Sequence, residues 1–429
     1  MATSSRLLHA VVELSIGDRV RTTVPPSVME GFRYTSRLAG PAGSRMECTI
    51  FDTTGFEVEQ ALLGLDPVRG VPEAPITARW GFPEAPGVGE VWAAERKFRM
   101  IRFTPEYTHG GTRIQIEAAP WIDEGPRLAA DTTATHRGKI SDVVTQVARD
   151  LGFPDERIFV EETDVFRHGL WGIAFGEPEG RLGLPRIIDR GEQEWQFGSA
   201  YPIDYINERM LPLARSATDG RPFEPARIVA GRQGPEFHFR PVRETPPYLE
   251  VVAWFGRTDE VLSFTPELNS SLLGELGSRG VVTYVTDPDT KEVHAVRAAP
   301  NETPAGTPVS PHPPNRVGDD AAEPPATMAL VTQDNFDRAQ AELEGIWAAL
   351  VYSVQKATLV LRGTPENMLV LAEDLIVIHA TLKNGGTHWS SGRYRVAEAA
   401  HEVGSGGYHI SLNLYRDYEA GEEALVAQR

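Results

Sequence analysis

Two pairs of alternating segments, each folded about a glycine-rich turn, restrict this chain to a mainly β fold. Residues 98–105 (FRMIRFTP) and 112–120 (TRIQIEAAP) alternate apolar and polar residues on either side of His109-Gly110-Gly111. Residues 393–403 and 408–417 do the same around a second turn, Gly404-Ser405-Gly406-Gly407. A period of two is typical of strands with one buried face, and glycine suits the tight turn between them. The sequence therefore predicts two long β-hairpins.

Further segments read as strands at both ends of the chain. These are residues 7–18 (LLHAVVELSIGD), 46–52 (MECTIFD), 248–255 (YLEVVAWF) and 374–383 (DLIVIHATLK). Short strands separated by Gly- and Pro-rich turns indicate β domains. The sequence leaves open whether the N-terminal and C-terminal β-rich regions are diverged copies of one unit.

A change of hydrophobic period marks an insert between these regions. Apolar residues at helical spacing predict one helix with a single buried stripe, made of Ile140, Val143, Val144, Val147, Ala148 and Leu151. Ser141 or Thr135 is expected to cap its start, and Gly152 with Pro154 to end it. A second helix is expected around 201–215 and a strand at 237–239, so we expect a small α/β or α+β insert.

Residues 297–328 have a different composition. They contain eight prolines, and from residue 301 to 327 there is no Phe, Tyr, Trp, Leu or Ile. Such a segment cannot bury enough apolar surface to offset its ordering entropy, so we expect a flexible linker or loop. After it, residues 336–350 predict a helix with one apolar face.

These patterns divide the chain into five parts. The expected parts are an N-terminal β domain (1–130), a small α+β insert (131–245), strands leading into a second β domain (246–296), the Pro-rich linker (297–328), and a helix followed by the C-terminal β domain (329–429). The expected fold is therefore mainly β with an α+β insert and several domains.

Composition excludes several classes of protein. The single cysteine allows no internal disulfide framework, and no run approaches the roughly 20 apolar residues of a membrane helix. The N-terminal residues lack the basic-then-apolar order of a secretory signal. The formal net charge of -18 repels phosphate, so the chain is not expected to grip nucleic acid, although it could let it pass.

Candidate chemical sites each have a structural interpretation that fits better. The turn at 404–407 lacks the Lys-Ser/Thr and helix of a phosphate-binding loop. The acidic turn at 287–292 lacks the glycine and the final glutamate of a calcium loop. Cys48 lies in an alternating strand and is expected to be packed rather than nucleophilic.

The remaining chemistry-bearing residues are dispersed. Four histidines of the C-terminal region lie on separate segments, without metal-ligand spacing, and are expected at surfaces or turns: His379, His388, His401 and His409. No pair of carboxylates stands out, no Gly-x-Ser-x-Gly motif occurs, and the eight tryptophans are expected to be core or interface anchors. We therefore assign no catalytic, cofactor-binding or metal residue and expect no enzyme.

The order of segments resembles the phage late control protein D family, the tail hub proteins related to the central hub of contractile phage baseplates and to the hub part of the type VI secretion spike. Five stretches carry the resemblance: 98–119, 136–153, 194–215, 261–293 and, most specifically, 389–417 (WSSGRYRVAEAAHEVGSGGYHISLNLYRD). One departure follows Pro365, where ENMLVLAEDL replaces a more glycine-rich approach.

The resemblance implies a structural hub subunit rather than an enzyme. It implies two β-barrel-like tube domains per chain and a homotrimeric ring of pseudo-six-fold symmetry that joins the tail tube to the spike and surrounds the ejection channel. The implied partners are the tail tube, spike or tip, tape-measure and other baseplate proteins, with genome DNA only as passing cargo. No needle domain follows Tyr418, so a separate spike protein is implied.

The resemblance also implies synthesis in the host cytoplasm and a place at the tail tip or baseplate of the virion. The channel is expected to be acidic or near neutral. Three alternatives remain open: the equivalent hub of a phage-like contractile injection system, a tail-associated cell-wall hydrolase, and a glycan-binding host-recognition module.

Overall fold

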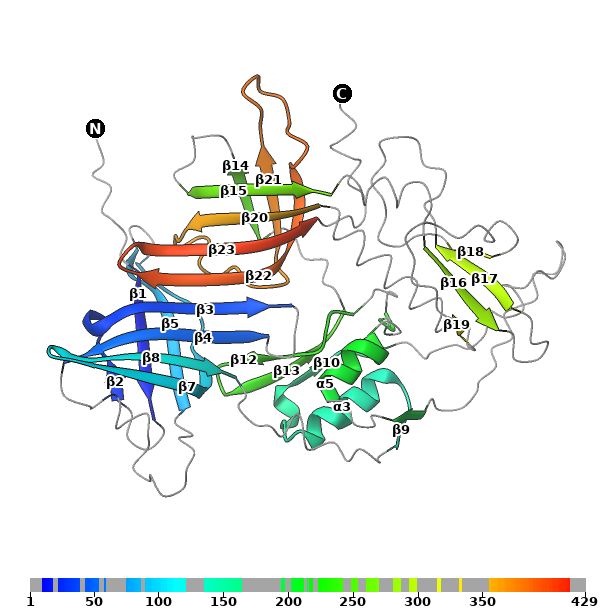
Figure 1. The fold of residues 1–429 in the computed structure, drawn as a ribbon, viewed down its shortest axis with the longest axis horizontal. Helices are drawn as coiled ribbons and strands as arrows, with labels where there is room; N and C mark the ends of the chain where they lie inside the picture. Colours follow the sequence, from blue (N-terminus) through cyan, green and yellow to red (C-terminus); the bar gives the residue numbers. More distant parts are fainter. Residues whose placement is uncertain are drawn as a thin grey trace.

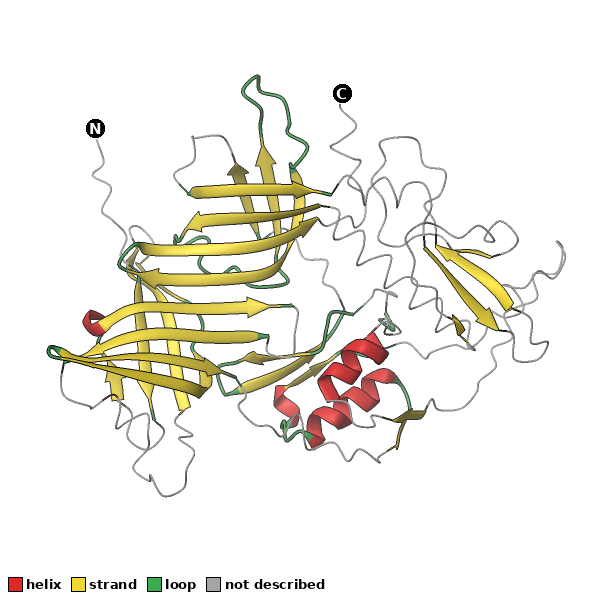
Figure 2. Cartoon of the chain, viewed as in Figure 1, coloured by secondary structure: helices red, strands yellow, loops and turns green. Residues whose placement is uncertain are grey.

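The computed structural model describes most of the strand-forming segments and the insert. The described residues are 10–17, 22–38, 43–53, 58, 75–85, 89–120, 135–163, 194–196, 202–211, 214, 216–218, 223–241, 248–253, 260–269, 281–286, 293–298, 315–317, 332–333 and 355–416. The fold is mainly β, as predicted (Figure 2). Among these residues, no helix has both the length and the apolar character needed to cross a membrane.

One 14-stranded sheet dominates the molecule (Figure 1). Its main path runs β15-β20-β23-β22-β3-β4-β8-β7-β5-β1-β2. From the N-terminal region it contains β1 (Val11–Ile16), β2 (Thr22–Val24), β3 (Met29–Arg37), β4 (Ser44–Asp52), β5 (Pro75–Ala85), β6 (Gly89–Trp92), β7 (Arg96–Thr108) and β8 (Gly111–Ala119). From the C-terminal region it contains β14 (Leu249–Ala253), β15 (Val261–Leu268), β20 (Gln355–Arg362), β21 (Leu375–Ala380), β22 (Gly392–Gly404) and β23 (Gly407–Arg416).

A five-strand arrangement occurs twice in this sheet. In the N-terminal half the order is β3-β4-β8-β7-β5, and in the C-terminal half it is β15-β20-β23-β22-β21, with every neighbouring pair antiparallel. The hairpins β7–β8 and β22–β23 both close on a two-residue turn, with Thr108 opposite Gly111 and Gly404 opposite Gly407. Both predicted hairpins are confirmed.

The irregularities of the two halves coincide as well. The extra residue of β7, Ile101, lies seven residues before the last residue of its strand, and so does the extra residue of β22, Ala397. The second residue of β3, Glu30, and the second residue of β15, Leu262, are also skipped in the register. Because bulges bend and twist a strand locally, shared bulges give both halves the same curvature. The structure therefore shows that the two β-rich regions are copies of one unit.

The two copies are joined edge to edge. The first residues of β22 pair with β21, and its residues 398–404 then pair with residues 31–37 of β3. This antiparallel ladder turns the two halves into one continuous sheet of eight strands, from β15 to β7.

One face of that sheet is apolar and buried, and the other is polar. In β4, buried Met46, Cys48 and Ile50 alternate with partly exposed residues, as the sequence predicted. On the buried side, Trp80 of β5 stacks on Phe32 and Tyr34 of β3, with ring centroids 5.7 and 4.8 Å apart. β5 pairs with the first residues of β7 and β21 with those of β22, and side chains of both strands, including Ile376 and Ile378 of β21, share one core with the apolar face.

The insert has its own core. Its elements are α3 (Ile140–Asp150), η2 (Asp155–Arg157), α5 (Pro202–Tyr205), the π-helical η3 (Ile206–Met210), and a three-stranded sheet of β10 (Ile158–Val160), β12 (Arg227–Ala230) and β13 (Pro235–Phe239). The helix α3 is confirmed, and all six residues of its predicted stripe are buried. In Figure 2 the helices gather beside the large sheet.

The expected cap of α3 was wrong. The N-cap is Lys139, which makes no side-chain cap, and the backbone N–H of Ser141 donates instead to the hydroxyl of Thr163, 3.0 Å away. A hydroxyl that is distant in sequence but near in space thus satisfies the helix start. The second helix begins at Pro202, and its described helical residues reach Met210.

Smaller elements complete the described chain. These are η1 (Pro26–Val28), the pair β9 (Thr135–Arg137) and β11 (Glu194–Gln196), and a four-stranded sheet of β16 (Val281–Thr286), β17 (Val293–Ala298), β18 (Asn315–Val317) and β19 (Thr332–Gln333). Within the Pro-rich segment 297–328, 315–317 thus form a strand, and most of the rest lies outside the described residues, as does the predicted helix at 336–350. The five domain boundaries stay predictions.

Candidate functional site

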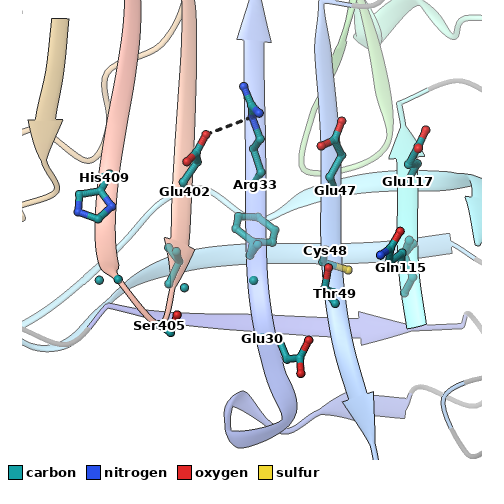
Figure 3. A pocket seen from close by; sticks show the side chains of 17 residues that line it. Glu30, Arg33, Glu47, Cys48, Thr49, Gln115, Glu117, Glu402, Ser405 and His409 are labelled. Carbon is teal, nitrogen blue, oxygen red and sulfur yellow. Dashed lines mark ion pairs between the residues drawn. The ribbon is translucent and has the colours of Figure 1, made fainter. Parts of the chain in front are cut away.

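The polar face of the eight-stranded sheet carries an unbroken row of charged and titratable residues. The strand register places one residue of each strand opposite one of the next: Arg362 (β20), His409 (β23), Glu402 (β22), Arg33 (β3), Glu47 (β4), Glu117 (β8) and Arg102 (β7). Figure 3 shows five of them, from His409 to Glu117, side by side across their strands. The row crosses the β22–β3 joint without interruption.

Opposite charges within and beside this row are paired. Arg33 Nε lies 3.4 Å from a carboxylate oxygen of Glu402, and Arg37 Nε lies 2.9 Å from Glu398 on the same two strands. Arg45 bridges Glu47 (3.5 Å) and Glu117, and Glu117 also binds Arg102. Hydrogen bonds from Arg102 and Arg45 hold the pKa of Glu117 below its usual value.

A shallow cavity of about 530 Å³ lies at the end of this face, next to the β22–β23 turn (Figure 3). Its floor includes Gly31, Gly404 and Gly406. Cys48 also borders it; its side chain is buried, as expected for a packed cysteine, and burial raises the pKa of the thiol to about 12.

The eight-stranded sheet ends in two edges that have no partner strand within the described residues. Residues 102–108 of β7 pair with β8 only, and β15 pairs with β20 only. Four large apolar side chains on these two strands are exposed: Ile101 (50%) and Tyr107 (61%) on β7, and Leu262 (45%) and Leu268 (44%) on β15. Apolar side chains on unpaired edges are typical of surfaces that are covered in an assembly.

A buried hydrogen-bonded chain secures the joint between the halves. The Trp80 indole N–H donates to the Tyr408 hydroxyl (3.1 Å), and Tyr408 is 2.8 Å from Nδ1 of His401. His401 Nε2 lies 2.7 Å from the carbonyl oxygen of Val370. Because a carbonyl only accepts, Nε2 carries the proton, so Nδ1 accepts from Tyr408. The polar groups of Trp80, Tyr408 and His401 in this hydrogen-bonded series are thus all satisfied when the imidazole of His401 is neutral.

His401 corrects one prediction. It was expected at a surface or turn, yet its side chain is fully buried and stacks on Trp80, with ring centroids 5.2 Å apart. Burial lowers the pKa of His401 to about 4, and burial raises that of Tyr408. An isolated sequence position in a strand does not reveal which face is buried when both halves contribute to one core.

A second buried cluster fastens the insert to the sheet. Glu373, which precedes β21, binds Arg227 at the start of β12 and Arg240 just after β13. Glu224 lies 3.2 Å from Arg227 and 3.8 Å from Arg395 of β22. Burial raises the pKa of Glu224, against the opposing effect of the surrounding arginines. Glu373 also has a left-handed backbone, with φ of 86°.

The other residues considered in the sequence stay apart. His379 lies 3.6 Å from Glu250, His388 bonds to Ser390 and His409 belongs to the charged row. Trp80 is a core anchor, whereas Trp389 is exposed. Among the described residues, no three His, Cys, Asp or Glu side chains converge as metal ligands would. Sequence reasoning missed the charged row, because only the strand register aligns it.

Comparison with known proteins shows which solved structures have a similar fold. The chain matches no protein-family model and no curated protein sequence. Among solved structures it is similar to the 43 kDa tail protein of prophage MuSo2 from Shewanella oneidensis (TM-score 0.51, 10% identity, 94% of this chain and 98% of that one). It is also similar to the tail protein from Neisseria meningitidis MC58 (TM-score 0.52, 11% identity, 95% and 97%). The chain therefore has the fold of tail proteins, which confirms, as a fold, the resemblance seen in the sequence.

We expect acid to weaken the joint through His401. Its pKa is lower folded (about 4) than unfolded (6.5), so its contribution is fully present above pH 6.5 and is lost as pH falls toward 4. The loss amounts to about 3 kcal/mol. The free energy of unfolding, measured with urea at several pH values from 4 to 8, should therefore change less steeply with pH in His401→Gln than in the unchanged protein. Equal slopes for the two proteins would contradict this role.

We also expect Glu373 to be needed for docking of the insert. Glu373→Gln removes the carboxylate that Arg227 and Arg240 share and leaves Glu224 as the remaining buried counter-charge, so it should lower the free energy of unfolding by about 3 kcal/mol. The exposed Glu366→Gln, in the same connection, should change it by less than about 0.5 kcal/mol. Replacing Arg240 with Met in the Glu373→Gln background should recover part of the loss, whereas additive losses would refute the pairing.

Proposed function

We propose that this chain is a structural hub subunit of a phage tail tip or baseplate. Three copies form a ring of pseudo-six-fold symmetry that joins the tail tube to a spike and surrounds the ejection channel. The observation that supports this most directly is the repeated unit: each chain supplies two copies of it, joined edge to edge through β22 and β3.

The unpaired edges suggest how the copies meet. The register equates β7 with β22 and β15 with β3, and within the chain β22 and β3 form the joint. We infer that β7 of one subunit faces β15 of the neighbouring subunit in the same manner. This arrangement places Glu106 opposite Thr265, as Glu402 stands opposite Arg33. It also covers the exposed apolar side chains of both strands.

Prolines on both edges modify this contact. Pro105 of β7 and Pro266 of β15 fall opposite each other in the inferred register, where His401 and Tyr34 pair within the chain. Proline has no N–H and is typical of edge strands. Main-chain bonding is therefore incomplete at this step, and side-chain contacts carry more of the interface between copies than of the joint within a chain.

The layers indicate which face lies inside. The apolar face already shares one core with β5 and β21, and a closed ring has more room for extra layers on its outer side. The polar face, which no described element covers, then lines the channel. Eight strands from each of three copies make 24. At about 4.8 Å per strand this gives a backbone diameter of roughly 37 Å before tilt widens it. Porins hold an aqueous channel with only about 16 to 18 strands.

In this proposal the chain supplies position rather than chemistry. The tail tube and the spike or tip protein bind the two ends of the ring, the tape-measure protein and then genome DNA pass through it, and other baseplate proteins surround it. The site of action is the virion tail.

Cysteine cross-linking tests the ring. The variant Glu106→Cys/Thr265→Cys places two thiols on exposed positions that meet only between copies, so a short bismaleimide should yield covalent dimers and trimers. Each single variant should yield none. Arg33→Cys/Glu402→Cys is the matched control, because its thiols face each other within one chain and should link without a change in oligomer mass. The ring would be refuted if the test variant stayed monomeric while the control linked.

A further inference from the structure

Five arginines of the polar face are individually matched by glutamates. Over β22, β3, β4, β8 and β7, five arginines each lie within hydrogen-bonding or ion-pair distance of a glutamate: Arg33 with Glu402, Arg37 with Glu398, Arg45 with Glu47 and Glu117, Arg102 with Glu117, and Arg113 with Glu30 (2.7 Å). Most partners lie on adjacent strands or along one strand, and Arg113 of β8 reaches across β4 to Glu30 of β3, so the strand order brings each pair together.

This balance is local. The whole chain carries a formal charge of -18, but the five arginines and five glutamates of this set cancel. A purely acidic face would repel a polyanion, and unpaired arginines would bind it. The alternating pairs do neither strongly, because each positive charge is adjacent to a negative one well within the Debye length of about 8 Å at physiological salt.

The consequence for phosphate follows from counterion release. Each cation that neutralises a phosphate of duplex DNA steepens the salt dependence of binding by about 0.9 in log–log slope, and several together change affinity by orders of magnitude. An arginine already bound to a carboxylate has to leave it before it can bind phosphate. The carboxylate that has lost its arginine then repels the phosphate. Glu47, Glu117 and Glu402 are therefore the groups that keep Arg33, Arg45 and Arg102 occupied.

We propose that this row of arginine–glutamate pairs is a non-adhesive track for duplex DNA, in which the glutamates mask arginines that would otherwise hold the phosphate backbone. The proposal rests on the proposed function, because the face encloses a passage only within a ring. The masking itself is a property of one chain and can be measured without the ring.

Charge-matched variants of the full chain test the track. Glu47→Gln/Glu117→Gln/Glu402→Gln unmasks three arginines, whereas Glu84→Gln/Glu156→Gln/Glu366→Gln changes the net charge equally at exposed positions away from the row. Binding of a labelled DNA duplex is followed by fluorescence anisotropy over a range of salt. We expect the unmasked variant to bind with a log–log salt slope steeper by up to about three, and the control to behave like the unchanged protein.

Two further measurements make the outcome decisive. Thermal melting establishes that both triple variants are folded, and adding Arg33→Gln, Arg45→Gln and Arg102→Gln to the unmasked variant should abolish the gained binding. Equal binding by the two triple variants, or strong binding by the unchanged protein at about 0.15 M salt, would overturn the proposal. Light scattering on the same samples separates the two proposals, since a monomer with the expected salt response would support the masking of the arginines and contradict the ring.

Discussion

The antiparallel ladder between β22 and β3 is the interaction on which the rest of this structure depends. It merges two copies of one β unit into a continuous sheet, and it brings Trp80, Tyr408 and His401 into a single buried chain of hydrogen bonds. His401 is held neutral there, because burial and the nearby positive charge of Arg96 both lower its pKa. The joint therefore combines main-chain pairing with a core that both halves share.

The same geometry explains why the sheet has two edge strands, β7 and β15, that can pair with another subunit. In each half, the strand that carries the central bulge stays paired with its hairpin partner but separates from the strand on its other side. There β22 leaves β21 and pairs with β3, whereas β7 leaves β5 and has no second described partner strand. In the proposed ring, this side of β7 meets β15 of the next subunit, and cyclic symmetry is the usual arrangement of identical subunits. The insert, held by Glu373 and three arginines, adds mass to each chain without interrupting the sheet.

Local patterns predicted the local structure well. Alternation located the hairpins β7–β8 and β22–β23, the six-residue stripe located α3, and the strand context of Cys48 indicated its burial. Long-range features were beyond a single sequence. The repeat is expressed in registers and bulges, such as Ile101 matching Ala397, rather than in similar residues. The charged row and the buried His401 depend on which strands become neighbours, and strand order is set by tertiary packing.

Electron microscopy of the purified chain, or of particles that contain it, tests the central claim most directly. The account predicts a three-fold ring in which β7 of each copy lies against β15 of the next, so that the eight-stranded sheets form one closed wall with the arginine–glutamate row facing the axis. A map in which these two edges lie apart from one another, or in which the polar face of β22, β3 and β4 points away from the axis, would contradict it.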